Sequence, residues 1–262
     1  MLRHLELKQV GPAPEMRLDF RPRLNILTGD NSLGKTFVLD VAWWALTQTW
    51  PGKPENEKKT MAWPLPGRRR GATISFTYAQ RSGNILHRST FDAEKEEWPL
   101  RPGEPGNPGL VLYLRIDGGF SLWDPARHHR KALEIREHVD PHRSKSFDFD
   151  MEEIWNGLRA NGNVFCEGLI SDWKTWKDRQ GAEYRMLCDV LPALAPHQEG
   201  VVQPADFTQL SVADVREIPT IHTPYGEVPV TLASAGMKRV LALAYLIVWA
   251  YTKHVSACRL IG

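Results

Sequence analysis

The sequence has little of what marks several common classes of protein. Its three cysteines, Cys166, Cys188 and Cys258, are far apart and odd in number, so we expect neither a disulfide framework nor a zinc site. The 33 Lys and Arg residues nearly balance the 31 Asp and Glu residues, and a formal charge of +2 does not indicate a dedicated polyanion binder. The longest apolar run, Val240–Tyr251, is shorter than the roughly 20 residues that cross a bilayer.

The rest of the composition is that of an ordinary globular protein. Hydrophobic residues make up 42% of the 262 residues and charged residues 24%, which excludes a disordered chain, a collagen-like fibre and a coiled coil. Ten tryptophans and 19 prolines predict a sizeable core joined by irregular loops. Met1–Lys8 alternates apolar and charged residues and has no signal-peptide core, so we expect a cytoplasmic protein without a membrane anchor.

Hydrophobic periodicity predicts a mixture of strands and helices. Apolar residues alternate with polar ones on both sides of Gly11–Pro14, the pattern of a hairpin, and Leu24–Thr28 is mostly apolar, as expected of a buried central strand. Further strands are expected at 73–78, 85–91 and 110–116, and a turn at 223–226 between strand-like flanks. Helices are expected from Lys35 to just before Pro51, at 150–158 and 169–194, and from 235 or 236 to about 253.

One motif carries specific chemistry. Gly29–Thr36 matches G-x-x-x-x-G-K-[ST] and stands between an apolar segment and an amphipathic helix, the context in which this motif binds a nucleoside triphosphate. Its glycines let backbone N–H groups point at phosphate oxygens, Lys35 supplies a charge to the β and γ phosphates, and Thr36 offers its hydroxyl to Mg²⁺. We therefore predict Lys35 as the catalytic residue and Thr36 as the metal ligand. The predicted nucleotide-binding residues are Gly29, Asp30, Asn31, Ser32, Leu33, Gly34, Lys35 and Thr36.

A second motif stands near the other end of the sequence. Thr231–Arg239 leads into the apolar helix and resembles the signature motif of ABC-type ATPases, usually written L-S-G-G-Q, from which Ala235 and Met237 depart. A small turn with a hydroxyl at a helix N-terminus suits contact with a γ-phosphate from outside. A serine N-cap followed by small residues explains the same pattern. We interpret Ser234, Ala235 and Gly236 as signature residues that contact the nucleotide of a second copy.

The hairpin, the apolar segment that enters Gly29–Thr36 and the second motif, in this order, resemble the RecF/SMC-like branch of ABC ATPases, which includes AAA family ATPases of the AAA15/AAA21 kind. The resemblance implies an α/β P-loop NTPase of ABC-ATPase type, with a mixed central sheet, N-terminal antiparallel hairpins and a helical insertion. It implies one incomplete domain over 1–262. Its parts are a P-loop lobe at 1–120, a mostly helical insertion at 121–210 and a signature region at 211–262.

Part of the family's machinery has no counterpart in this sequence. In that family a hydrophobic strand ending in Asp-Glu, the Walker B motif, follows the signature helix, and its carboxylates hold Mg²⁺ and activate water. Only Arg259–Gly262 follow here, Glu152–Glu153 does not end an apolar strand, and no Q-loop glutamine is assigned. The chain thus resembles the N-terminal portion of an ATPase. We expect exposed apolar surface, unpaired strand edges, and poor stability unless another polypeptide completes the fold.

The resemblance implies binding of ATP with Mg²⁺, ATP hydrolysis in the complete protein, and a homodimer in which two copies sandwich two nucleotides. Bacterial relatives often act with nucleases in DNA maintenance or phage defence, so the resemblance also implies an effector or nuclease partner. A non-hydrolysing module that signals its nucleotide state to a partner is the alternative. DNA binding rests on Arg68–Arg70, a run that is more often a solvated charge cluster. An Asn-Lys-x-Asp motif is absent, which argues against a GTPase.

Overall fold

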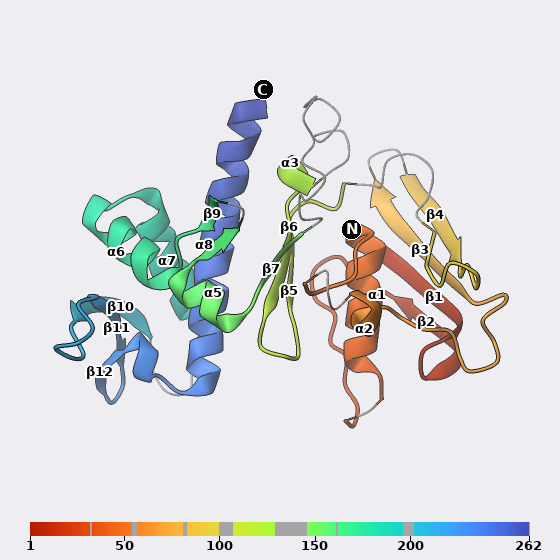
Figure 1. Cartoon of the computed structure of the whole chain (residues 1–262), viewed down its shortest axis with the longest axis horizontal. Coiled ribbons are helices and arrows are strands. Elements are labelled where there is room, and N and C mark those ends of the chain that lie inside the picture. Colours follow the sequence, from red (N-terminus) through yellow and green to blue (C-terminus); the bar gives the residue numbers. More distant parts are fainter. Residues whose placement is uncertain are drawn as a thin grey trace. The chain divides into compact units, whose positions relative to one another are not determined.

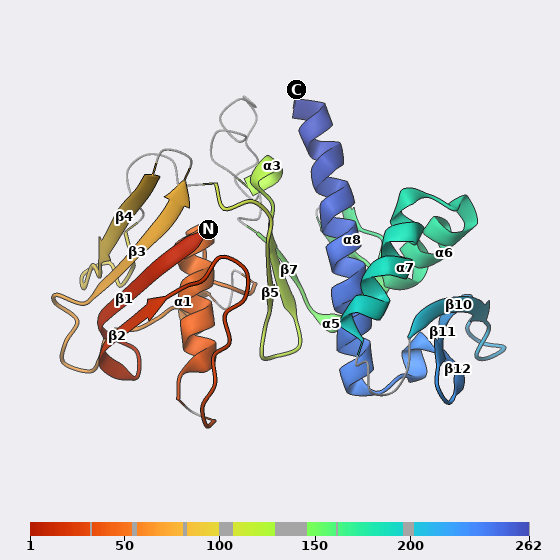
Figure 2. The same ribbon diagram turned by 180° about the vertical axis from the view of Figure 1, so that it is seen from behind.

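A computed structural model describes residues 1–31, 33–53, 57–80, 83–99, 107–128, 146–160, 162–195 and 202–261 (Figure 1; Figure 2). The chain folds into two compact units. Unit 1 comprises Met1–Ile116 and Ser121–Asp148, and unit 2 comprises Asp117–Phe120 and Phe149–Gly262. The chain therefore passes between the units at three points. The described residues of 149–160, 162–195 and 202–210 thus belong to the same compact unit as the predicted signature region at 211–262.

Unit 1 is built on an antiparallel sheet of four strands in the order β2-β1-β3-β4. Leu5 and Leu7 of the first strand and Ile74 of the third are fully buried, because alternate residues of a strand face the same side. Both hairpins predicted from this alternation are confirmed, although positions 81 and 82 of the second turn lie outside the described residues. The strands are β1 (Leu2–Val10), β2 (Ala13–Asp19), β3 (Thr73–Gln80) and β4 (Gly83–Thr90).

Helix α1 (Lys35–Thr47) packs on this sheet, as the ribbon of unit 1 shows (Figure 1). Val41, Trp44 and Ala45 are buried in the same apolar cluster as the inner residues of β1 and β3, which confirms the predicted apolar face of the helix. A second side of α1 carries Trp43, which clusters with Tyr113 and Trp123. The helix that follows Gly29–Thr36 is thus held on two sides.

The second contact of α1 is with β5 of a smaller, three-stranded sheet. Its strands, in the order β5-β6-β7, are β5 (Val111–Leu114), β6 (Phe120–Trp123) and β7 (Phe147–Phe149). Tyr113 of β5 donates a hydrogen bond from its hydroxyl to Oδ1 of Asp40 in α1, at 2.7 Å. Two short helices, α2 (Glu57–Thr60) and α3 (Pro125–His128), also belong to unit 1.

Leu24–Thr28 forms no strand, so the prediction of a buried central strand is wrong. The side chains of Leu24 and Ile26 are 72% and 74% exposed. No sheet in the described part of the chain includes the segment, so no neighbouring strand satisfies its backbone groups. The Asn25 side chain instead hydrogen-bonds the N–H and the C=O of Arg21, at 2.7 and 3.0 Å. The exposure of the segment matches the expectation of uncovered apolar surface.

The exposure of this segment makes a testable prediction. Replacing Leu24 and Ile26 together by Ala should change the free energy of unfolding by no more than about 0.5 kcal/mol per site, because water already surrounds both side chains. The matched substitution Leu7→Ala removes a fully buried side chain and should cost about 2–5 kcal/mol. Urea denaturation of the three proteins measures the difference. A loss of several kcal/mol in the double variant would show that the segment packs as an interior strand.

Unit 2 mixes helices with short hairpins. The insertion predicted to be mostly helical therefore also contains strands, and the predicted turn at 223–226 joins two of them. The helices are α5 (Met151–Asn156), α6 (Leu169–Arg179), α7 (Ala182–Leu194), the 3₁₀ helix η3 (Val230–Leu232) and α8 (Ala235–Ile261). The strands are β8 (Leu158–Ala160), β9 (Asn163–Cys166), β10 (Gln203–Thr208), β11 (Ile218–Thr223) and β12 (Gly226–Pro229).

Helix α8 is the long element of unit 2. It packs against α7 and α5, and Leu241, Tyr245 and Val248 are fully buried. By length and by a mean hydropathy of 1.3, Ala235–Leu260 could cross a membrane, but 50% of its most apolar window is buried inside the protein. That packing is typical of a core helix. With its antiparallel sheets and the helices packed on them, the protein belongs to the mixed α/β class, while the expected mixed central sheet is not formed by the described residues.

Candidate functional site

The predicted phosphate-binding loop lies at the start of α1 in unit 1. Gly29 has a φ of 141° and Gly34, the N-cap of α1, a φ of 79°. Residues that carry a side chain rarely adopt either of these backbone conformations. Both positions therefore require the glycines that the motif supplies. The helix begins at Lys35, as predicted, and its first turn contains no acidic residue that would repel an anion. Ser32 lies outside the described residues.

The Lys35 side chain folds back over the loop. Its Nζ donates hydrogen bonds to the carbonyl oxygens of Gly29, at 2.6 Å, and Asp30, at 2.7 Å. The ammonium group therefore lies against the backbone of the loop, at the beginning of the helix, where the N–H groups of a helix lack internal acceptors. Phosphate oxygens could replace the two carbonyls as acceptors for this cation.

The other predicted residues of the loop are mostly accessible. Asp30, Asn31 and Leu33 are exposed, and Leu33 keeps 61% of its surface in water, whereas Gly34 and Thr36 are partly buried. Thr36 lies in the first turn of α1 next to Lys35, which is where the motif requires the hydroxyl that binds Mg²⁺. Within the described ranges, no three His, Cys, Asp or Glu side chains gather in a metal-binding group. The threonine hydroxyl thus stays the predicted ligand.

The turn of the first hairpin packs on this loop, a contact that the sequence does not reveal. Gly11 lies against the ring of Phe37 in the first turn of α1, and Pro12 lies against Gly34. Gly11 also donates its N–H to the carbonyl of Trp63, at 3.0 Å. The sequence shows that Gly11 and Pro12 form a turn, but nothing in their spacing indicates which element the turn contacts.

The second predicted motif lies at the start of α8 in unit 2. Ser234, Ala235 and Gly236 are exposed. The Ser234 hydroxyl accepts a hydrogen bond from the N–H of Met237, at 3.2 Å, which is the geometry of an N-cap. The structure thus shows the capping role directly. A capped and exposed helix start also remains open to an anion from outside, so the two interpretations of this segment are compatible.

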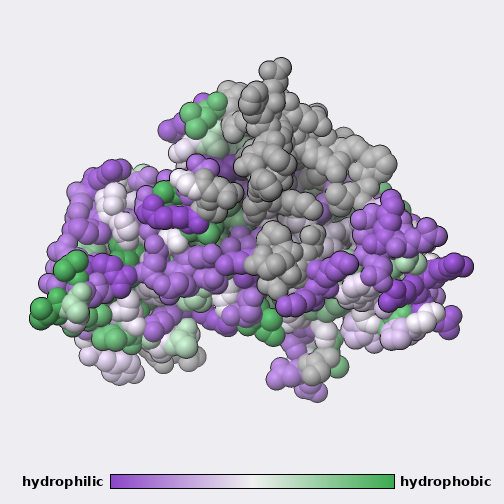
Figure 3. Space-filling view, viewed as in Figure 1, coloured by the Kyte–Doolittle hydropathy of each residue, from purple (hydrophilic) through white to green (hydrophobic). Residues whose placement is uncertain are grey.

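Apolar side chains are also exposed on the surface of unit 2, the unit that carries this second motif. In Figure 3 they show as green patches at the lower left, over the loop that joins β10 and β11. Val212 and Val215 in this loop are 99% and 82% exposed, and Leu232, two residues before Ser234, is 66% exposed. Exposed apolar patches of this kind are typical of surfaces that bind another protein.

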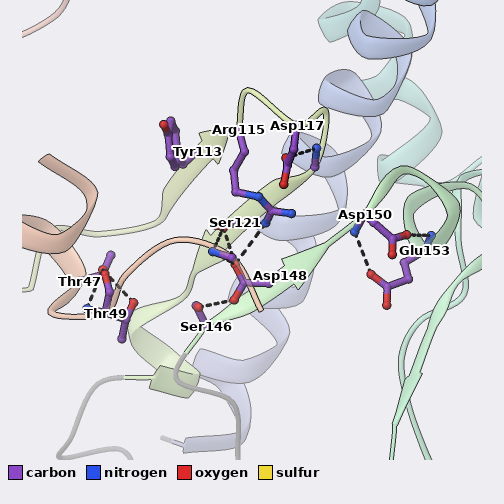
Figure 4. A network of polar contacts seen from close by, with 12 residues as sticks. Thr47, Thr49, Tyr113, Arg115, Asp117, Ser121, Ser146, Asp148, Asp150 and Glu153 are labelled. Carbon is purple, nitrogen blue, oxygen red and sulfur yellow. Dashed lines mark hydrogen bonds and ion pairs between the residues drawn. The ribbon is translucent and has the colours of Figure 1, made fainter. Parts of the chain in front are cut away.

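A buried polar cluster in unit 1 was not predicted (Figure 4). The side chains of Arg115 and Asp148 are only 9% and 6% exposed and form an ion pair of 3.4 Å. Asp148 also accepts hydrogen bonds from the hydroxyls of Ser121 and Ser146 and from the N–H of Gly52, the last at 2.9 Å. Burial raises the pKa of the Asp148 carboxyl, and these hydrogen bonds together with Arg115 oppose the shift.

This cluster lies where the chain passes between the units. Arg115 is one residue before the first crossing at 116, Ser121 follows the second, and Asp148 precedes the third. Gly52 comes after the end of α1. The cluster therefore joins the segments of unit 1 that lead into and out of unit 2 to the chain that follows α1. Three segments far apart in the sequence meet here, around residues 52, 115–121 and 146–148, so local spacing does not predict the cluster.

The sequence predictions for cysteine and acidic residues have mixed outcomes. All three cysteines are free; their sequence positions favour ordinary buried thiols, but only Cys166 is buried, Cys188 is partly buried and Cys258 is exposed. The hydroxyl of Tyr245 donates to Asp172, at 2.7 Å, and lies 2.9 Å from Sγ of Cys166, so this thiol belongs to a buried polar group within unit 2. Glu153 forms a capping box with Asp150 at the start of α5 and, as predicted, does not end an apolar strand.

A cleft of about 660 Å³ in unit 2 is a further concave feature, lined by α5, α6 and the segment before β11. Its charged side chains are paired within the lining or with residues beside it, Arg216 with Asp214 and Glu167 with Arg159, both at 2.7 Å. Lys174 pairs with Glu217 at 2.5 Å, and Arg216 donates to Asn156 at 2.7 Å. A cleft whose charges are neutralised in this way does not indicate a particular ligand.

The comparisons with known proteins assign neither a family nor a function to the chain. No family model matches the chain, and no curated protein matches it. Among solved structures, the chain is similar to an SMC head domain. That domain, from Thermotoga maritima, shares 16% sequence identity and a TM-score of 0.36, over 94% of this chain and 72% of that chain. At this identity and TM-score the likeness assigns neither a family nor an activity, so the functional assignment depends on the residues of the chain itself.

Proposed function

We propose that the chain binds ATP with Mg²⁺ through Gly29–Thr36. The observation that carries this proposal is the geometry of the loop at the start of α1. Glycines with positive φ stand at its two ends, and the Lys35 ammonium lies across its backbone, 2.6 and 2.7 Å from two carbonyl oxygens. Such a loop recognises the phosphates of a nucleotide rather than its base. The choice of ATP follows from the resemblance of both motifs to ABC-type ATPases.

We further propose that nucleotide binding brings two copies of the chain together through Ser234, Ala235 and Gly236. The exposure of this segment supports the proposal, as does the exposed apolar surface at Val212, Val215 and Leu232 in the same unit. In this arrangement Lys35 and Thr36 of one copy hold the nucleotide, and Ser234 and Gly236 of the other contact its γ-phosphate. A nuclease or another effector, and DNA, are partners that only the sequence resemblance and Arg68–Arg70 suggest.

Hydrolysis requires one carboxylate to hold Mg²⁺ and another to activate water. The family resemblance implies that two such carboxylates serve the ATP site. The alternative function is a module that binds ATP without hydrolysing it and passes its state to a partner. Glu153 forms a capping box with Asp150 at the start of α5, so it is not proposed as one of these carboxylates. Release of phosphate from ATP by the purified chain would argue against the alternative.

Competition binding tests the proposed site. The purified chain should bind a fluorescent ATP analogue in the presence of Mg²⁺, and unlabelled ATP should displace the analogue. AMP should compete at least about a hundredfold less well, because it lacks the two phosphates that the loop and Lys35 would hold. Light scattering with ATP, but not with AMP, should show that the mass of the monomer doubles. Equal competition by ATP and AMP would contradict the proposed site, and an unchanged mass would contradict the dimer alone.

A further inference from the structure

The glycine at the turn of the first hairpin lies unusually close to the phosphate-binding helix. A Cβ atom added to Gly11 would lie 2.2 Å from Cζ of Phe37 and 2.4 Å from its Cε1. These separations are far below van der Waals contact, so the Phe37 ring occupies the space that any other side chain at position 11 would need. Close approach of this kind requires glycine, in addition to the requirement set by a φ of 74°.

A second contact joins the same hairpin turn to Gly34, the residue before Lys35. A Cβ added to Gly34 would lie 2.9 Å from Cγ of Pro12. Gly34 is the N-cap of α1, and Phe37 is the third residue of the helix. The contacts of Gly11 and Pro12 therefore bracket Lys35 and Thr36, the two residues proposed to hold the phosphates and Mg²⁺.

Hydrogen bonds and packing within unit 1 fix the position of the hairpin turn. Gly11 donates its N–H to the carbonyl of Trp63, and the N–H of Leu65 donates to the carbonyl of Gln9, at 3.0 and 2.9 Å. Val10, one residue before the turn, is fully buried and bridges to Pro64. Phe37 is partly buried against the core cluster of unit 1, so its ring has limited freedom to turn away. Any displacement at the turn must therefore be taken up largely by the start of α1.

We infer that Gly11 is a positioning residue for nucleotide binding: by admitting the Phe37 ring beside the fixed hairpin turn, it sets where Lys35 and Thr36 begin α1. This inference rests on the proposed function, since the loop must bind a nucleotide for the position of its helix to matter. A side chain at position 11 pushes Phe37 and the first turn of α1 out of place, and the loop then presents its cation and hydroxyl poorly to the phosphates.

The chain offers a matched control for the test. Gly67 has the same φ of 74° as Gly11, but a Cβ added there meets nothing within 4 Å. The variants Gly11→Ala and Gly67→Ala therefore introduce the same backbone strain, and only the first introduces a clash. Affinity for the fluorescent ATP analogue with Mg²⁺ should fall on the order of tenfold in Gly11→Ala and stay near wild type in Gly67→Ala. Equal affinities of the two variants would overturn the inference.

Rescue distinguishes positioning from a general loss of stability. Adding Phe37→Ala to Gly11→Ala removes the ring that meets the new methyl group, so the double variant should bind the analogue as Phe37→Ala does alone. If affinity stays depressed relative to Phe37→Ala, the inference is wrong. Thermal unfolding of all variants checks that lost affinity does not simply follow lost stability. If Gly11→Ala fails to fold, Pro12→Gly, which removes the contact with Gly34 and adds no atoms, should itself weaken binding.

Failure of the proposed function can be recognised separately. Hydrogen exchange at the amides of residues 38–41, the first of which donates to the carbonyl of Gly34 at 3.0 Å, reads the integrity of the first turn of α1 without any nucleotide. Gly11→Ala should speed this exchange relative to Gly67→Ala, whether or not the wild-type chain binds ATP. Faster exchange without any binding by the wild type would support the contact and overturn the proposed site. Unchanged exchange would overturn the inference even if ATP binds.

Discussion

The variant Lys35→Ala is expected to bind ATP at least about a hundredfold more weakly than the wild-type chain. A hydrogen bond to a charged group contributes about 1.5–3 kcal/mol, and Lys35 would supply such bonds to two phosphates. Its ammonium already lies at the start of α1, where it donates to the carbonyls of Gly29 and Asp30. Competition with the fluorescent ATP analogue in the presence of Mg²⁺ measures the effect.

Controls separate this effect from a general loss of charge. Lys58→Ala removes an exposed lysine of α2 in the same unit and should leave the affinity for ATP unchanged. Lys35→Arg keeps the charge but replaces a compact ammonium with a planar fork, so it should recover only part of the affinity. Equal affinity of Lys35→Ala and the wild type would mean that Gly29–Thr36 is a structural turn and not a nucleotide site.

The second large effect is expected from the buried ion pair of unit 1. Arg115→Met should lower the free energy of unfolding by about 3–5 kcal/mol, because it leaves the Asp148 carboxylate buried without its cation. The two side chains are only 9% and 6% exposed, so water cannot take the place of the guanidinium. Chemical denaturation measures the loss. Arg17→Met, which removes an arginine that is 60% exposed, serves as a control and should change stability little.

This loss should depend on pH in a direction that follows from the carboxyl group. Burial raises the pKa of Asp148 above its ordinary value of 3.8 in the folded chain. A carboxyl with a raised pKa favours folding when protonated, and that contribution is lost as pH rises through the folded value. Removing Arg115 raises the pKa of Asp148 further. The destabilisation of Arg115→Met should therefore be smallest near pH 4 and grow towards neutral pH, and a pH-independent loss would contradict this account.

Local patterns predicted much of the fold. The alternation around Gly11–Pro14 gives the first hairpin, and the change of period at Lys35 gives the start of α1, because side-chain spacing on a strand or helix is set by the backbone alone. The motif Gly29–Thr36 likewise predicts its own geometry. Positive φ at Gly29 and Gly34 is what a loop with inward-pointing N–H groups needs, so a contiguous match carries structural information.

The incorrect and missing predictions concern contacts between distant segments. Leu24–Thr28 has the composition of an interior strand, but a strand also needs neighbours to accept its hydrogen bonds, and composition does not show whether they are there. The Asp148 cluster joins three separated segments, around residues 52, 115–121 and 146–148, and their distances along the chain give no recognisable pattern. The close approach of Gly11 to the Phe37 ring was not predicted for the same reason, since Phe37 lies on another element.

The path of the chain between the two units has a consequence for how the protein forms during synthesis. Unit 1 contains no residue beyond Asp148, and only Asp117–Phe120 within that stretch belong to unit 2. The ribosome therefore releases every part of unit 1 before most of the second unit has been translated. At usual elongation rates the remainder takes on the order of ten seconds, which is long compared with the folding of a small domain. The nascent chain can thus fold the loop Gly29–Thr36 before the segment Ser234–Gly236 emerges.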